Sequence, residues 1–151
     1  MEDLQVKHII TKDGSSTLYS PRFDEHYHSV HGAIQESLHV FLKMGLEALP
    51  PEKTEIQLLE MGFGTGLNAI LTLLNTGTRK IFYTGIESYP VPPKVAEELN
   101  YAEAIHGEGT AESFAKLHAA AWDEWVEINK QFSLQKVHGR LEDFQVEPQF
   151  D

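Results

Sequence analysis

The sequence contains no cysteine. This absence excludes a disulfide scaffold, Cys-ligated zinc, iron–sulfur clusters and thiol catalysis. No apolar run approaches the roughly 18 residues that a membrane-spanning helix needs, so we expect no membrane partner. The first ten residues, MEDLQVKHII, lack the basic segment and apolar stretch of a secretory signal. These absences predict a cytoplasmic protein.

Basic residues are also scarce: 12 Lys and Arg stand against 23 Asp and Glu, and the formal net charge is −11 at pH 7. This balance disfavours simple polyanion binding, because affinity for nucleic acids depends largely on Lys and Arg that neutralise phosphates. A role with nucleic acid therefore requires a local basic surface. The length of 151 residues, with 41% apolar and 23% charged residues, is typical of one globular domain.

The amino-terminal third carries signals for a hairpin and a helix. Two short strands, Gln5–Ile10 and Ser16–Tyr19, are expected around a turn at Asp13. Apolar side chains with helical spacing follow at Ile34, Leu38, Phe41 and Leu42. We therefore expect residues 1–50 to form a hairpin and helix extension, and residues 51–151 to form the core of the domain.

Strand and helix signals alternate through the core, which predicts an α/β fold with a parallel sheet. The expected strands are Ile56–Met61, Lys80–Ile86 and Leu134–His138. Helical spacing begins again at Leu67, directly after the first strand. Between the second and third strands it predicts two helices, the first with Val95 and Leu99, the second with Phe114, Leu117, Ala121 and Trp125.

A glycine-rich loop, EMGFGTGLN, joins the first core strand to its helix. Glycines let a ligand approach the backbone closely, and the start of a helix offers free N–H groups. The spacing of Gly62, Gly64 and Gly66 is G-x-G-x-G, which differs from the G-x-G-x-x-G of a pyrophosphate-binding loop. Glu60, just before the loop, would repel a pyrophosphate but would suit a ligand that carries an ammonium group.

A second acidic residue, Glu87, is expected at the carboxyl end of the next strand. An acid in that position can accept hydrogen bonds from both hydroxyls of a ribose. A ribose and an ammonium group without phosphate describe S-adenosylmethionine (SAM). Asn68 would either bind the methionine part of SAM or stabilise the start of the helix. The alternatives are a nicotinamide or flavin dinucleotide, or a glycine-rich turn beside two solvated acids.

The segments FDEHYHSVHGAIQESLHVFL and IESYP, together with the glycine loop, resemble the tRNA 5-methylaminomethyl-2-thiouridine methyltransferases. The resemblance covers roughly residues 16–151. The family pattern F-D-x-x-Y, then G-x-x-E-S-x-x-V-F, is matched by Phe23, Asp24, Tyr27, Gly32, Glu36, Ser37, Val40 and Phe41. It implies a Rossmann-like, SAM-dependent methyltransferase fold that methylates the aminomethyl group of a wobble uridine in tRNA. Tyr27 and Glu36 become candidate substrate residues, with packing and helix-surface roles as alternatives.

The sequence departs from the family pattern after the third strand. The family usually places an acid beside the glycine there, to hold the adenine amino group, but Arg140 follows Gly139 here. We expect Glu142 and Asp143 to serve as a pair. The family also has a further strand with an Asp-x-Phe-x-Pro-like motif, at the point where this sequence ends with Phe150-Asp151.

These departures predict the first half of a Rossmann-like sheet, with no assigned catalytic residue and an open edge on the first strand. We therefore expect the isolated chain to be inactive and marginally stable, and to form a homodimer through that edge, aggregate or show disorder. The resemblance also implies an FAD-dependent oxidase, as a domain or a separate protein, that acts on the same tRNA nucleoside. The alternative function is a non-catalytic SAM-binding module.

Two further groups of residues are candidates for ligand binding. His26, His28 and His31 lie close together and could bind Zn²⁺ or Ni²⁺, but they lack the ligand spacing of established zinc sites. We therefore predict no metal. Trp122 and Trp125 could stack on an unpaired nucleobase, although their helical spacing favours core positions.

Overall fold

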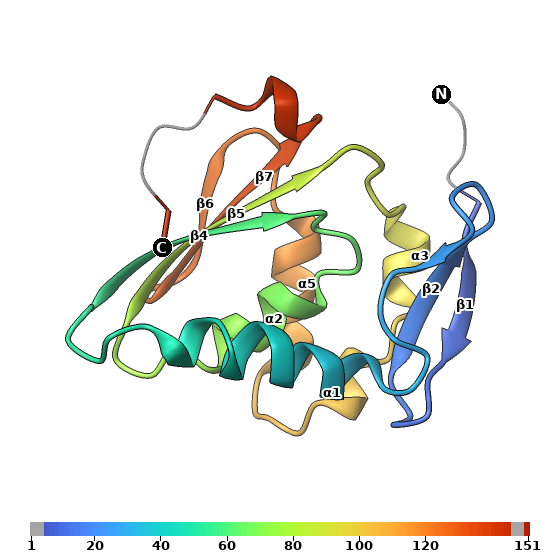
Figure 1. The fold of residues 1–151 in the computed structure, drawn as a ribbon, viewed down its shortest axis with the longest axis horizontal. Coiled ribbons are helices and arrows are strands. Elements are labelled where there is room, and N and C mark those ends of the chain that lie inside the picture. Colours follow the sequence, from blue (N-terminus) through green and yellow to red (C-terminus); the bar gives the residue numbers. More distant parts are fainter. Residues whose placement is uncertain (1–4, 146–149) are drawn as a thin grey trace.

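Two β-sheets organise the chain in a computed structural model that describes residues 5–145 and 150–151 (Figure 1). The core sheet has four strands in the order β4-β5-β7-β6. They are β4 (Glu55–Met61), β5 (Lys80–Glu87), β6 (Trp125–Asn129) and β7 (Phe132–His138). A smaller antiparallel sheet contains β1 (Lys7–Ile10), β2 (Ser16–Ser20) and β3 (Glu25–His26).

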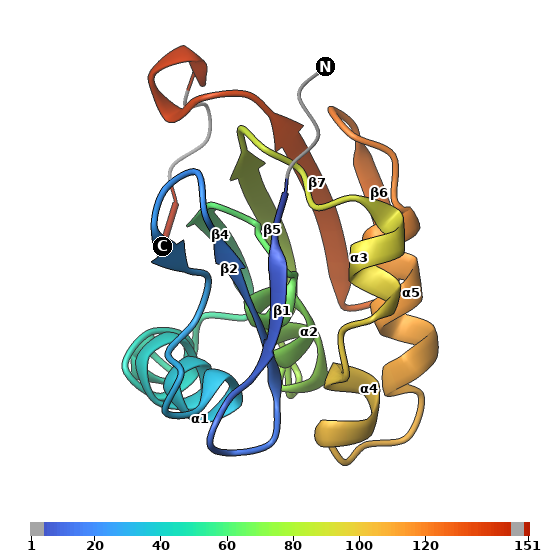
Figure 2. The same cartoon turned by 90° about the vertical axis from the view of Figure 1, so that its right-hand side faces the viewer.

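Short helices connect these strands. The first, α1 (Ala33–Ser37), continues as a π-helical turn, η1 (Leu38–Lys43), and a 3₁₀ turn, η2 (Leu46–Ala48). The others are α2 (Leu67–Leu74), α3 (Pro93–Glu97), α4 (Tyr101–Ala104), α5 (Thr110–Ala119) and the 3₁₀ turn η3 (Leu141–Asp143). Figure 2 shows α2, α5 and the small sheet on the same side of the core sheet. Within the described ranges, no helix has the length and apolar character needed to cross a membrane.

The three strands expected in the core are confirmed. β5 lies between β4 and β7 and pairs with each of them in parallel. Because all three strands run the same way, the glycine loop after β4, Glu87 of β5 and His138 of β7 come to the same edge of the sheet. This is the edge at which open α/β sheets bind ligands.

The two faces of the core sheet differ in burial. The face toward α2 and α5 contains the buried side chains of Ile56, Ile81, Tyr83, Phe132 and Leu134. Their alternation along each strand is the pattern of a sheet that is packed on one side. The opposite face is more open: Met61 is 66% exposed and Trp125 is 45% exposed.

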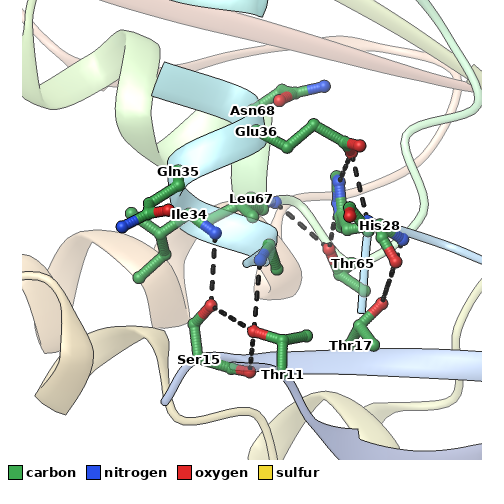
Figure 3. Close-up of polar contacts among 12 residues, drawn as sticks. Thr11, Ser15, Thr17, His28, Ile34, Gln35, Glu36, Thr65, Leu67 and Asn68 are labelled. Atoms are coloured by element: carbon green, nitrogen blue, oxygen red, sulfur yellow. Dashed lines mark hydrogen bonds and ion pairs between the residues drawn. The ribbon is translucent and has the colours of Figure 1, made fainter. Parts of the chain in front are cut away.

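The expected hairpin is confirmed, and its turn stabilises the start of α1. β1 and β2 pair antiparallel, with Lys7 opposite Tyr19. The turn between them accepts hydrogen bonds from the first backbone N–H groups of α1: Ala33 N donates to Thr11 Oγ1 and Ile34 N to Ser15 Oγ, both at 3.2 Å (Figure 3). Such groups have no partner within a helix, so the hairpin supplies the cap that Gly32 lacks.

The prediction of one helix that extends through Ala121 and Trp125 is wrong for its second half. α5 ends at Ala119, and Trp125 begins β6, which pairs antiparallel with β7. Asp123 adopts a left-handed φ of 63°, and its N–H donates to Lys136 O at 2.6 Å. Pairing with β7 therefore overrides the helical spacing of the apolar residues.

The strand that precedes the glycine loop lies at an edge of the sheet, as expected. β4 pairs with β5 on one side only within the described strands. On its other side, Asp151 N donates to Gln57 O, and Gln57 N donates to Asp151 Oδ2, each at 2.8 Å. Asp151 thus occupies the edge of β4 at a single position.

Candidate functional site

The glycine loop leaves β4 in a conformation that only glycine adopts easily. Gly62, Gly64 and Gly66 have φ angles of 84°, 55° and 80°. In this left-handed region a side chain is strained. Gly62 N and Phe63 N both donate to Ile86 O, at 2.8 and 3.1 Å, so the loop is attached to the end of β5. The sequence thus folds the loop across the carboxyl edge of the sheet.

Glu87 lies directly beside the loop, as the parallel pairing of β4 and β5 requires. Its Oε2 accepts a hydrogen bond from Gly64 N at 2.9 Å, and its Oε1 accepts one from Tyr89 N at 3.0 Å. Tyr27 covers the other side of Gly64, since a Cβ on that glycine would lie 3.1 Å from the Tyr27 ring. Burial, followed by the charge of Glu87, raises the pKa of Tyr27 to about 12. The structure therefore brings three predicted residues together.

Glu60 and Asn68 form a second pair, beneath the loop. Asn68 Nδ2 donates to Glu60 Oε2 at 2.6 Å, which connects the end of β4 to α2. Burial raises the pKa of Glu60 to about 8. Glu60 Oε1 and Asn68 Oδ1 are buried without a hydrogen bond of normal geometry among the described residues, and the Tyr83 hydroxyl is the polar neighbour of Glu60. Buried polar atoms of this kind are rare in folded proteins, and they mark a place where a ligand or water can bond.

Thr65, which no sequence pattern predicted as a site residue, is the point where three other parts of the chain meet the loop. Its Oγ1 lies 3.2 Å from His28 Nε2 and accepts a hydrogen bond from Tyr101 OH at 3.2 Å. Its carbonyl lies 2.8 Å from His118 Nε2. His28 precedes α1, Tyr101 begins α4 and His118 is near the end of α5. The loop is therefore held from two helices and from the amino-terminal segment, whose contact between His28 and Thr65 is drawn in Figure 3.

Glu36 acts on the loop through His28 in this structure. Glu36 Oε1 lies 3.7 Å from His28 Nδ1 and accepts a hydrogen bond from Ser29 N at 3.2 Å. Burial lowers the pKa of His28, and the charge of Glu36 partly opposes that effect. Figure 3 shows His28 between Glu36 and Thr65, in contact with both side chains. Glu36 is thus connected to the glycine loop by one intervening side chain.

The histidines near the amino terminus have separate environments. The His26 ring contacts the Tyr19 ring in a tilted arrangement, with 5.0 Å between the centroids, whereas His28 Nε2 lies 3.2 Å from Thr65 Oγ1. Among the residues that the structure describes, no group of three or more His, Asp or Glu side chains is arranged to hold a metal ion.

A cavity of about 1290 Å³ lies beside the glycine loop. Phe63 and Gly64 form one wall, and the remaining walls come from the amino-terminal segment, the loop after β5, the end of α5 and β7. The other lining residues are Gln5, Pro21, Arg22, Ser88, Tyr89, Pro90, Val91, Pro92, Pro93, His118, Trp122, Lys136 and His138. Of the predicted site residues, Gly64 contributes to this lining.

The two residues expected at the adenine position lie outside the lining of this cavity. Glu142 and Asp143 are in η3, after the carboxyl end of β7, and both are exposed. Neither lines the cavity. Their role as a pair that holds adenine stays a prediction.

The fold is that of a mixed α/β protein with a glycine-rich loop at the carboxyl edge of a parallel-containing sheet. No family model matches the chain. Several curated relatives carry the name "tRNA 5-methylaminomethyl-2-thiouridine biosynthesis bifunctional protein MnmC". That of Magnetococcus marinus is 44% identical over 82 residues, that of Cupriavidus metallidurans 32% over 116, and that of Burkholderia multivorans 37% over 133.

These matches cover 50%, 75% and 83% of this chain but only 12%, 15% and 20% of the relatives. The crystal structure of MnmC2 from Aquifex aeolicus is similar over 95% of this chain and 47% of that chain, with a TM-score of 0.68 and 25% identity. The chain belongs to the MnmC family, and it corresponds to a part of its relatives.

Proposed function

We propose that this chain is the SAM-binding part of a methyltransferase that acts on the aminomethyl group of a modified wobble uridine in tRNA. The observation that carries the proposal is the contact between the glycine loop and Glu87, where Gly64 N donates to Glu87 Oε2 at 2.9 Å. A G-x-G-x-G loop with an acid beside it suits a ribose and an ammonium group better than a pyrophosphate. The names of the MnmC relatives support the tRNA substrate.

The residues present fit SAM. A Cβ on Gly62 would meet no atom within 4 Å, so the space next to this part of the backbone is open. Glu87 can accept hydrogen bonds from ribose hydroxyls, because each carboxylate oxygen accepts more than one hydrogen bond. Glu60 Oε1 and Asn68 Oδ1 offer buried acceptors for the ammonium group. SAM, when bound, supplies an electrophilic methyl group on its sulfonium.

The amino-terminal segment would complete the site. Tyr27 packs on Gly64, and Glu36 reaches the loop through His28. These two residues would position the RNA nucleotide or close the site over the cofactor, and positioning contributes much of the rate in a direct transfer between two bound groups. Such a reaction on tRNA would take place in the cytoplasm. The word "bifunctional" in the names of the relatives is consistent with a second activity, for which we propose an FAD-dependent oxidase acting on the same nucleoside.

Calorimetry with SAM and with NADH tests the cofactor. We expect SAM to bind and NADH not to bind, whereas the reverse result would refute the proposal. Glu87→Gln should weaken SAM binding by roughly 1–3 kcal/mol, because it replaces hydrogen bonds to a charged acceptor. Glu55→Gln is the matched control, since Glu55 is an exposed acid at the amino end of β4.

Mass spectrometry of tRNA nucleosides tests the reaction. tRNA with an aminomethyl group on its wobble uridine would be incubated with SAM and the protein. A gain of one methyl group on that nucleoside supports the enzyme. SAM binding without any methyl transfer would favour the non-catalytic SAM-binding module.

A further inference from the structure

Lys136 is a buried cation that has no carboxylate partner among the described residues. Its side chain is 1% exposed, and its Nζ donates to His118 O at 2.9 Å, at the end of α5. The Nζ also lies 4.8 Å from the ring centroid of Trp122 and 5.8 Å from that of Phe63. Over residues 5–145 and 150–151, no carboxylate is within ion-pair distance of Lys136. A buried charge is costly unless it is paired, so an anion from outside the chain would stabilise it.

The cavity beside Lys136 has a lining of one sign of charge. Among the described residues that line it, the charged side chains are the cations Arg22 and Lys136, and no Asp or Glu contributes. The chain as a whole has 23 acidic and 12 basic residues, so this lining is opposite in character to the rest of the molecule. A cleft with one sign of charge concentrates ligands of the opposite sign.

Aromatic rings accompany these cations. Arg22 Cζ lies 4.8 Å from the ring centroid of Tyr89 and 5.6 Å from that of Phe23. Trp122 meets Phe63 edge-on, with 6.4 Å between the ring centroids, and both rings line the cavity. Flat rings bind nucleobases by stacking, and nearby cations bind the phosphates that join them.

The cavity is also large. Its volume of about 1290 Å³ exceeds the roughly 300–1,000 Å³ that is usual for one small ligand. Only one of its walls is formed by the glycine loop. There is therefore room for a second ligand beside a cofactor that contacts the loop.

We propose that this cavity holds one nucleotide of an RNA, with its phosphate paired to Lys136 and its base against Trp122 and Tyr89. The inference rests on the proposed function, because it assigns the RNA of that reaction a place on this chain. It also provides the local basic surface that an acidic protein needs in order to bind RNA. Burial lowers the pKa of Lys136 to about 8. A phosphate beside the ammonium group would raise this pKa again, because a nearby negative charge favours the protonated form.

Tryptophan fluorescence tests this inference in the full chain. A Trp125→Phe background leaves Trp122 as the single tryptophan, and Trp125 is exposed on the far side of the sheet from Lys136. The probes are a six-nucleotide uridylate RNA, uridine 5′-monophosphate, uridine and SAM. We expect the RNA to quench Trp122 and to bind at least about tenfold more tightly than the monophosphate, because further phosphates add charge contacts. Uridine without phosphate should bind more weakly still.

Two variants connect the quenching to the cations. Lys136→Met should raise the dissociation constant of the RNA at least about tenfold and reduce its salt dependence. Lys80→Met is the matched control: it removes the same charge at the amino end of β5, where Lys80 is exposed. Arg22→Met should also raise the dissociation constant of the RNA. Because the side chain of Arg22 is exposed, we expect this variant to fold. The SAM affinity of each variant, measured separately, should stay unchanged.

Several results would overturn the inference. Equal RNA binding by a folded Lys136→Met protein and the Lys80→Met control would show that Lys136 serves only to join β7 to α5. Equal binding of the RNA and the monophosphate would assign the cavity to a free nucleotide. Quenching by SAM alone would show that the cavity is the cofactor site, and the proposed function would then survive without this inference.

Discussion

Glu60 and Lys136 occupy one row of the core sheet, on either side of Gly85 in β5. Glu60 extends to Asn68 of α2, and Lys136 extends to the end of α5. Phe63 fills the space between them, because a Cβ on Gly85 would lie 2.8 Å from Phe63 Cδ2. A ring from the glycine loop therefore separates the buried acid from the buried base, and the absence of a side chain at position 85 makes room for it.

Gly85→Ala should disturb this arrangement. The added methyl group collides with Phe63, which must move together with the loop, so we expect the free energy of unfolding to fall by about 1–3 kcal/mol. SAM affinity should fall as well. Urea unfolding and calorimetry measure the two effects. Gly139→Ala is the control, since a Cβ there meets no atom within 4 Å. Equal behaviour of the two variants would mean that Phe63 is not what fixes the loop.

Glu60 should couple SAM binding to proton release. Burial holds its pKa at about 8, so its carboxyl group is mostly protonated at pH 7. An ammonium group beside it would lower that pKa and expel the proton. Calorimetry in two buffers of different ionisation enthalpy should therefore detect release of a fraction of one proton, and Glu60→Gln should abolish it. The same release in Glu60→Gln would place the ammonium group elsewhere.

The same residue predicts a change of stability at alkaline pH. The pKa of Glu60 is higher in the folded chain than the value of 4.5 that it has when exposed. The protonated form is thus favoured by folding: its contribution is complete below about pH 4.5 and is lost as the pH rises through about 8. Urea unfolding between roughly pH 6 and 9 should show that the free energy of unfolding falls less with rising pH in Glu60→Gln than in the wild type. An identical loss in both proteins would contradict the assignment.

The edge of β4 should mediate self-association. The backbone N–H and C=O groups of Gln57 point to the open side of β4, where they bond to Asp151. The direction of these groups alternates from residue to residue along a strand, so the backbone groups of Leu59 point to the same open side. Unpaired edges recruit other chains. Light scattering should therefore detect a concentration-dependent dimer that Leu59→Lys weakens. Val137→Lys is the control, because it changes the same face on the inner strand β7. A monomer at all concentrations would refute the homodimer.

The parts of the fold that follow from local patterns could be predicted from the sequence. β4 and β5 are short apolar runs, and the glycines between β4 and α2 indicate a tight turn toward a helix, so Glu87 could be placed next to the loop. β6 could not be predicted, because Trp125 continues the helical spacing of Phe114 and Leu117. Its strand depends on the left-handed turn at Asp123 and on pairing with β7.

The residues that surround the loop were harder to find. His118 and Tyr101 reach Thr65 from helices that are distant in sequence, and no local pattern predicts those contacts. Lys136 did leave a signal. It follows Phe132 and Leu134 at intervals of two in a strand, which is the pattern of side chains that point into the core. A lysine at the third such position indicates a buried cation.

The central claim is that the open side of the glycine loop holds SAM, and paired glycine variants test it most directly. Gly62 and Gly77 have φ angles of 84° and 60°, and a Cβ at either one meets no atom within 4 Å. Alanine at each position should cost about 1–2 kcal/mol of stability through backbone strain alone. Gly77 follows α2 at the far end from the loop. In calorimetric titrations with SAM, we expect Gly77→Ala to bind like the wild type and Gly62→Ala to bind at least about tenfold more weakly, a change of about 1.4 kcal/mol. Equal SAM affinity of the two variants would contradict the account.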